Sequence, residues 1–342
     1  MTFTIAIPVF NGEKYLRQTL LSAVRQTRPA DEILVVDDAS TDGSKDIIND
    51  ISKQAAVRYI RNDTPTGFVD AWNRAIKYST TEYVSVLHQD DLLDEYYLMR
   101  AEEAFRQYPD AQHLYCGYHA IDAEGKRKQS SELPHTAAPV LITGKEYAKR
   151  YLHGVVQNKH LHRCPGVTTA RSLLVGTCSY RKEAGLIADD DFFIRVGTYT
   201  DVIGIGQPLA SFRIHDNSAT SRLESIARQL ARDYIYEVQF HLHNKEYLDD
   251  EGRMMLQQLA TRFIWTLLYE GITAGNTEWM NEARNYGRLL DETVSGWRDR
   301  HLSAAKRLLW RFDSSDGMLH QCAASYGKLI HAVMQLKKKF VH

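Results

Sequence analysis

The sequence predicts an α/β domain built on a mainly parallel sheet, followed by a helical C-terminal region. Over about residues 1–118, short apolar runs alternate with helical patterns, which is typical of parallel strands covered on both faces. From about 119 to 221 the pattern is less regular and rich in turn signals, which predicts loops and short helices over one end of the sheet. After residue 222 proline disappears and long stretches fit helices.

The expected elements follow from apolar periodicity, taken in chain order. We expect strands at residues 3–9, 32–36, 57–60, 83–87 and 114–118, separated by helices at 12–26, 42–51, 67–77 and 92–105. In the C-terminal region we expect helices at 222–243, 248–272, 277–291, 297–310 and 317–338. Ligands of such sheets bind beyond the carboxyl ends of the strands, so polar residues that directly follow a strand are the candidates for function.

Composition bounds the class of protein. A chain of 342 residues predicts about two domains. Its 42 basic and 43 acidic residues nearly cancel, which argues against nucleic acid as a partner. The four cysteines are far apart and predict a reducing compartment, with small apolar core residues as their ordinary role. The N-terminus has no signal-peptide pattern and no apolar run reaches about 18 residues, so we expect a cytoplasmic enzyme.

Two strands end in acidic residues. Residues 35–43 read Val-Val-Asp-Asp-Ala-Ser-Thr-Asp-Gly. Two carboxylates at the end of a buried strand are costly unless solvated or engaged, and they can accept from a base N–H or from ribose hydroxyls. A helix cap accounts for Ser40 or Asp42 but leaves Asp37 and Asp38 unexplained.

The fourth strand ends in His88-Gln89-Asp90-Asp91. Carboxylates at a sheet edge suit a hard divalent cation that keeps open positions for phosphate oxygens. An imidazole from His88 fits Mn²⁺ better than Mg²⁺. For Asp91, capping of the following helix is an alternative to metal binding.

Together with residues 7–12, these strand ends resemble inverting glycosyltransferase family 2. The family opens with a strand ending in P-x-[YF]-N, which residues 8–11 match, and a helix carrying S-[IV]-x-x-Q-[ST], which residues 22–27 match except at Ala23. Its next segment, VVDDxSxDGS, is reproduced by residues 35–44. A loop like N-x-G and a helix with an asparagine follow. Gly67 and Asn73 fit them, whereas Trp72 stands where the family usually has arginine.

The resemblance runs over about residues 3–215 and implies a GT-A fold, Rossmann-like, over residues 1–221. It implies a nucleotide-sugar half at about 1–118 and an acceptor half at about 119–221, and the helical pattern beyond them predicts a separate module at 222–342. The implied activity moves a sugar from a nucleotide-sugar donor, most commonly a UDP-sugar, to a hydroxyl of a saccharide or lipid-linked acceptor, as in surface polysaccharide synthesis.

The resemblance also implies site residues. Those expected to bind the nucleotide are Pro8, Phe10, Asn11, Asp37, Asp38, Gly67, Asn73, Gln89 and Asp90. The family's D-x-D motif falls on residues 88–90, with histidine in place of the first acid. The expected ligands of the Mn²⁺ or Mg²⁺ ion are Asp90, Asp91, His88 and His215. His215 belongs to a segment like R-x-H-x-x-S, in which it could instead contact a phosphate and Arg213 could offset diphosphate charge.

A third acidic cluster, Asp189-Asp190-Asp191, supplies the candidate base. Three consecutive acids repel one another, so at least one pKa should be raised. Inverting transfer needs a carboxylate that takes the proton of the acceptor hydroxyl. The family has an E-D pair before a helix with an arginine. Counting back from Arg195 places the base on Asp189, with Asp190 as the rival and Asp191 as a helix N-cap.

Further candidates border the acceptor side: Arg171, Tyr180 and Asp191. The histidine-rich residues 157–162 match no family motif, and we expect a mobile acceptor loop there rather than a metal site.

Two other classes of protein remain open on the sequence. A nucleotidyltransferase shares the sheet and the carboxylate logic, but the loop after the first strand offers only Gly12 where a glycine-rich triphosphate loop is wanted. A degenerate subunit that only binds nucleotide sugars is favoured by His88 and Ala188, which replace acids of the family.

The end of the chain carries basic amphipathic segments at residues 306–311 and 329–342. Such a helix can lie on an anionic membrane, and the alternative is a packing helix with a solvated basic end. Peripheral membrane contact would suit a lipid-linked acceptor.

Overall fold

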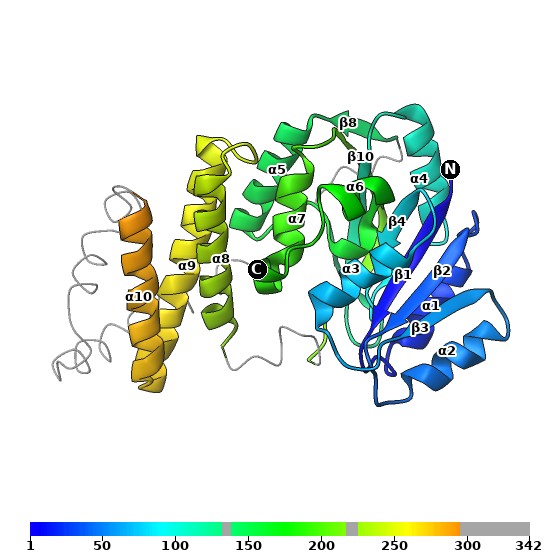
Figure 1. The fold of residues 1–342 in the computed structure, drawn as a ribbon, viewed down its shortest axis with the longest axis horizontal. Helices are drawn as coiled ribbons and strands as arrows, with labels where there is room; N and C mark the ends of the chain where they lie inside the picture. The colour runs from blue at the N-terminus through cyan, green and yellow to red at the C-terminus, as the bar shows by residue number, and fades with distance from the viewer. Residues whose placement is uncertain (132–137, 217–224, 295–342) are drawn as a thin grey trace. The chain divides into compact units, whose positions relative to one another are not determined.

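The computed structural model describes residues 1–131, 138–216 and 225–294 and has a mixed α/β fold with a helical C-terminal region, which confirms the predicted fold class (Figure 1). Contacts divide the chain into two units. The first holds all the described strands, helices α1 to α7 and the segment Glu246–Gly252. The second contains helices α8 and α10 and all but the first three residues of α9.

The first half follows the predicted alternation to within a few residues. In chain order its elements are β1 (Phe3–Val9), α1 (Leu16–Val24), β2 (Glu32–Asp37), α2 (Ser44–Ser52), β3 (Val57–Arg61), α3 (Phe68–Tyr78) and β4 (Tyr83–Val86). The remainder of the first unit is β5 (Leu92–Leu93), α4 (Tyr97–Gln107), β6 (His113–Ile121), β7 (Arg127–Ser130), β8 (Val140–Ile142), α5 (Gly144–Gln157), β9 (Val167–Ala170), α6 (Arg171–Gly176), α7 (Ala188–Val196) and β10 (Val202–Arg213). Short 3₁₀ helices lie at Cys164–Gly166 and Lys182–Ile187.

The sheet is mixed, and its strand order is β3-β2-β1-β4-β9-β6-β10-β5, with β7 on β6 and β8 on β10. The pairs from β3 to β4 are parallel, as predicted, and so is the pair of β6 with β10. Strand β9 runs against both β4 and β6. Because β9 is antiparallel to both of its neighbours, β4 and β6 run in the same direction. Strands β1, β2, β4, β6 and β10 therefore all end at the same edge of the sheet. That edge is where a ligand is expected.

Strand β1 is buried on both faces, which explains its unbroken apolar run. Ile5 and Ile7 pack in a core with residues of α1, α2 and α4, including Leu16 and Phe105. The opposite face, which carries Ala6, is covered by α3. Helices on both faces therefore fix the ends of the central strands.

Two expectations for the middle of the chain were wrong. The helix expected at 92–105 begins only at Tyr97, because Leu92 and Leu93 pair with β10 as a short strand. Asp91 therefore caps no helix. The segment after residue 119 is also more regular than expected, since it holds the twelve-residue strand β10 and the fourteen-residue helix α5.

The C-terminal helices α8 (Ile226–His243), α9 (Asp250–Ala274) and α10 (Thr277–Thr293) agree with three of the predicted ranges. The side chain of Ser225 caps α8 by accepting from the backbone N–H of Arg228 at 3.0 Å. The helices expected at 297–310 and 317–338, and with them the basic segments, lie outside the described residues. None of the described helices is long and apolar enough to cross a membrane.

We expect Gly144→Ala to lower the free energy of unfolding by about 1–3 kcal/mol, because the added methyl overpacks the contact between α5 and the end of α7. A Cβ on Gly144 would overlap the carbonyl oxygen of Gly197. Gly176→Ala is the matched control, since a Cβ there meets nothing within 4 Å. Urea unfolding of both variants measures the difference, and an equal effect of the two substitutions would contradict the close approach.

Candidate active site

Asp37, the last residue of β2, is buried and ion-paired within the protein. Its carboxylate accepts from the backbone N–H of Ser40 at 2.8 Å, from the Tyr59 hydroxyl at 2.7 Å and from the Arg61 guanidinium at 2.5 Å. Burial alone would raise the pKa of Asp37, but the hydrogen bonds from these three residues outweigh it and lower the pKa. The carboxylate is therefore charged and fixed beside the expected nucleotide.

Asp38 shapes the loop that leads to α3. It accepts from the Asn62 amide at 2.7 Å, from the Thr66 backbone N–H at 2.8 Å and from the Gly67 backbone N–H at 3.0 Å. Gly67 has a φ of 92°, which favours glycine. Asp38 thus holds the loop at residues 62–67 against the end of β2.

The loop after β1 presents Phe10 to solvent. The Phe10 side chain is 46% exposed, so its ring is free to pack on a base, whereas Pro8 is buried within β1. The Gln89 amide bonds both backbone groups of Phe10, at 2.8 and 3.1 Å. Asn11 has a φ of 51° and accepts from the Thr41 backbone N–H at 2.8 Å. These bonds tie the ends of β1, β2 and β4 together.

The predicted metal ligands lie at this edge as two pairs. His215 Nε2 lies 2.9 Å from Asp90 Oδ2, and His88 Nδ1 lies 3.8 Å from Asp91 Oδ2. Burial raises the pKa of Asp91 well above its usual range, and the charge of Asp90 adds to this rise. Burial lowers the pKa of His88, against the opposing effect of Asp90. A buried, neutral imidazole is the form that binds a metal.

The chemical types of these ligand atoms suit a divalent cation. His88 Nε2 and Asp91 Oδ2 are both buried without a hydrogen-bond partner in the part of the chain that the structure describes. Carboxylate oxygen with imidazole nitrogen suits Mn²⁺. In this arrangement, no three of the four side chains place their donor atoms within 4.8 Å of one another. A shared ion would therefore need the two pairs to turn toward one point.

Trp72 and His88, which both depart from the family pattern, contact each other. The indole of Trp72 stacks on His88, with ring centroids 4.9 Å apart and an interplanar angle of 21°. Trp72 also meets Tyr180 edge-on at 5.2 Å. Asn73 bonds both backbone groups of Tyr180, at 2.8 and 3.2 Å. Asn73 and the buried Tyr180 thus join α3 to the segment before α7.

The acidic cluster begins α7, and Asp191 is not the N-cap that the sequence predicted. Helix α7 starts at Ala188, and Ile187 is its N-cap, so Asp191 lies in the first turn. Its fully buried carboxylate binds Arg181 at 2.6 Å and Arg195 at 2.5 Å. Asp191 therefore anchors the start of α7 through these two ion pairs.

Asp189 and Asp190 differ in their surroundings. The Tyr151 hydroxyl donates to Asp190 Oδ1 at 2.6 Å, and the Asp190 backbone N–H donates to Asp189 Oδ1 at 3.0 Å. Burial, together with the charge of Asp190, raises the pKa of Asp189 to about 7, against an opposing effect of Arg163. A carboxyl group with a pKa near neutral is suited to take a proton at physiological pH.

Arg213, expected to face the diphosphate, is instead buried and saturated. It donates to the backbone oxygen of Asp90 at 2.8 Å, to those of Asp122 and Ala123 at 3.1 and 3.2 Å, and to Gln18 Oε1 at 2.8 Å. Its own backbone N–H donates to Asp91 Oδ1 at 2.8 Å. Arg213 therefore holds residues 88–91 in place; we call these residues the metal loop because they carry three of the predicted metal ligands.

Arg171 lies away from the site. Its backbone N–H bonds the carbonyl of Glu82 at 2.8 Å, and its guanidinium bonds that of Lys77 at 2.9 Å. Both carbonyls precede β4, so Arg171 lies at the opposite edge of the sheet from residues 88–91. The structure does not support an acceptor role for it.

The histidine-rich residues run from the end of α5 into a loop, as the sequence predicted, but His162 is part of the packed interior. This side chain is fully buried, and its Nε2 lies 2.8 Å from the Tyr147 hydroxyl. Its ring packs against Tyr151 at 5.1 Å and Phe193 at 4.5 Å. His162 thus packs against Tyr151, the residue whose hydroxyl binds Asp190.

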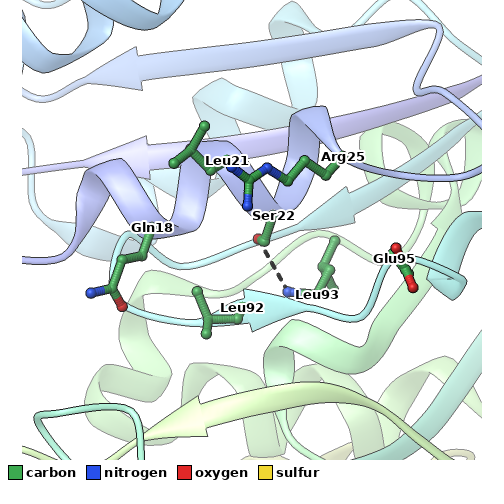
Figure 2. A pocket seen from close by; sticks show the side chains of 7 residues that line it. All are labelled: Gln18, Leu21, Ser22, Arg25, Leu92, Leu93 and Glu95. Atoms are coloured by element: carbon green, nitrogen blue, oxygen red, sulfur yellow. Dashed lines mark hydrogen bonds between the residues drawn. The ribbon is translucent and has the colours of Figure 1, made fainter.

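The family motif on α1 holds the chain that follows the metal loop. Ser22 Oγ accepts from the Leu93 backbone N–H at 3.2 Å, and the Gln26 amide bonds the backbone of Asp94 and Leu98 at 2.8 and 3.0 Å. Figure 2 shows the Ser22 bond within a pocket of about 360 Å³ between α1 and β5. None of the predicted site residues lines that pocket.

Comparison with known proteins places a glycosyltransferase domain in the first half of the chain. Residues 4–172 match the family model described as glycosyl transferase family 2. Among curated relatives, a poly(ribitol-phosphate) beta-glucosyltransferase of Bacillus spizizenii is 38% identical over 104 residues, which are 29% of this chain and 16% of that protein. The putative teichuronic acid biosynthesis glycosyltransferase TuaG of Bacillus subtilis is 30% identical over 89 residues, which are 26% of this chain and 35% of the relative.

The fold is shared with S. aureus TarS. The crystal structure of TarS residues 1–349 in complex with UDP-GlcNAc superposes with a TM-score of 0.67 at 16% identity, covering 98% of this chain and 92% of that one. The fold, the acidic strand ends and these matches define a glycosyltransferase domain. Residues 4–172 carry a glycosyl transferase family 2 domain, and the relatives are of the bacterial polysaccharide type. The matched segments span about a third or less of the curated relatives' own length.

Proposed function

We propose that residues 1–221 form a metal-dependent inverting glycosyltransferase that uses a nucleotide-sugar donor. The observation that carries the proposal is that Asp189, whose pKa is raised to about 7, lies close to the metal loop. The charges of both Asp189 and Asp91 raise the pKa of the buried Cys164 thiol, after burial itself, so both carboxyls lie close to one side chain. A base close to a leaving-group site is what single-displacement transfer requires.

In this proposal, Asp189 takes the proton of the acceptor hydroxyl as that oxygen attacks the anomeric carbon. The bond from the anomeric carbon to the diphosphate breaks, and the configuration inverts. Asp90, Asp91, His88 and His215 would hold the divalent cation, which supplies Lewis-acid stabilisation of the diphosphate. Phe10 packs on the base, and Asp37 lies beside the nucleotide.

The donor and acceptor classes rest on relatives. TarS was crystallised with UDP-GlcNAc, which supports a UDP-sugar as donor. The relatives named for poly(ribitol-phosphate) and teichuronic acid support a cell-wall polymer as acceptor.

The pH dependence of sugar transfer tests the base. Because Asp189 acts as the ionised base and burial raises its pKa to about 7, kcat/KM should fall tenfold per pH unit below about pH 7. Asp190→Asn removes the charge that adds to this rise, so the acidic limb should move to lower pH. The measurement is UDP release from a UDP-sugar with acceptor between pH 5 and 9. A wild-type profile that stays flat down to pH 5 would rule out Asp189 as the base.

A further inference from the structure

The side chain of Arg163 is held by contacts with aromatic rings, and its hydrogen-bond donors have no partner in the described chain. Its guanidinium lies over the ring of Phe212, 5.0 Å from the centroid, and 6.0 Å from that of Tyr118. Within the described chain the guanidinium has no hydrogen bond or ion pair, and its Nε is buried without a partner. Stacking on an aromatic face orients a guanidinium and leaves its in-plane N–H groups free.

The position of Arg163 is at the reacting edge of the sheet. Phe212 directly precedes Arg213, whose backbone N–H binds Asp91, near the end of β10. The charge of Arg163 also opposes the burial-driven rise in pKa of Asp189. Arg163 is therefore near the candidate base as well as the end of β10.

The other arginines of this region are engaged. Arg213 is saturated by backbone oxygens and Gln18, Arg181 and Arg195 bind Asp191, and Arg61 binds Asp37. A substrate phosphate at this edge of the sheet would bring negative charge close to several carboxylates. Arg163 is placed to offset that charge with donors that are not in use.

We propose that Arg163 binds a phosphate group of the substrate, and the donor's β-phosphate is the simplest source because it leaves next to the metal loop. This inference rests on the proposed function. A phosphate carried by the acceptor has the same chemistry and is the second source.

The test is calorimetric titration of the full chain with UDP, UMP and inorganic phosphate, each with Mn²⁺, using wild type, Arg163→Gln and Arg163→Lys. Arg163→Gln should weaken UDP binding about 10- to 100-fold, as expected for loss of a charged hydrogen bond. UMP, which lacks the β-phosphate, should change less than about threefold. Arg163→Lys should recover part of the loss, because it restores the charge without the fork of donors.

The phosphate arm separates the two sources. If UDP binds Arg163→Gln as it binds wild type, but inorganic phosphate no longer binds the UDP-saturated variant, the phosphate belongs to the acceptor and the proposal stands. Unchanged binding of all three ligands overturns it. Equal losses for UDP and UMP together with a lower melting temperature also overturn it, because Arg163 would then only support the fold. If the wild-type protein binds no nucleoside diphosphate, the proposed transferase function is refuted. The titration with inorganic phosphate still tests whether Arg163 binds a phosphate group.

Discussion

Asp189→Asn should lower kcat for sugar transfer by about 10²- to 10⁴-fold, the usual contribution of a general base. Asparagine keeps the size of the side chain but cannot accept the proton of the acceptor hydroxyl. The Asp190 backbone N–H, which donates to Asp189 Oδ1 at 3.0 Å, has an equivalent acceptor in the amide oxygen, so the start of α7 should be preserved. The measurement is the steady-state rate of UDP release with a saturating donor.

Asp190→Asn is the matched control. Asp190 is held by the Tyr151 hydroxyl at 2.6 Å, so we expect its substitution to shift the pH profile and to lower kcat far less at pH 8. The reverse ranking of the two variants, with Asp190→Asn inactive and Asp189→Asn active, would make Asp190 the base.

Arg213→Met should lower the free energy of unfolding by about 3 kcal/mol or more. Methionine fills much of the space but leaves several buried oxygens without a donor, and each such loss costs about 1–3 kcal/mol. Arg213 is 2% exposed and bonds four acceptors with its side chain. The midpoint and slope of urea unfolding measure the effect.

Arg106→Met is the control for a charge on the surface. Arg106 is paired with Glu102 at 3.1 Å, but its side chain is 69% exposed, so the change should lie within about 0.5 kcal/mol. If Arg213→Met were as mild as Arg106→Met, the metal loop would not depend on Arg213. A normal stability with lost nucleotide binding would instead return Arg213 to the diphosphate.

The sequence predicted the half of the fold whose strands are apolar on both faces. Strand β1 was expected at residues 3–9 and is found there, because an uninterrupted apolar run of that length has few other uses. Strand β10 escaped detection. It contains Gly204, Gly206 and Pro208, and its pairing with β6 shifts register between Ile205 and Ala210. Such irregularities interrupt the apolar periodicity from which a strand is predicted.

The short strand β5 could not be predicted for a different reason. Leu92 and Leu93 fit a helix by local pattern, but they pair with β10 more than a hundred residues away, and Ser22 binds the Leu93 N–H. Tertiary pairing overrides propensity in so short a segment.

For the site, the sequence indicated which residue types carry the chemistry but not which donors are free. Arg213 and Arg163 are both arginines near the reacting edge, and only packing shows that one is saturated and the other is not. Arg171 looked like an acceptor residue, but the antiparallel pairing of β9 with β4 carries it to the opposite edge. Trp72 and His88 looked like separate departures, whereas their stacking makes them one unit.

The most direct test of the account is the melting temperature of the chain with UDP, GDP, dTDP or CDP, each with and without Mn²⁺, for wild type and Asp90→Ala. A ligand at about 100 times its Kd stabilises the folded state by about 2.7 kcal/mol, which is a readable shift. We predict that one nucleotide, UDP by the relatives' example, raises the melting temperature of wild type only with metal, and that Asp90→Ala abolishes the shift. No shift with any of the four nucleotides, or an equal shift in Asp90→Ala, would contradict a metal-dependent nucleotide-sugar site at this edge of the sheet.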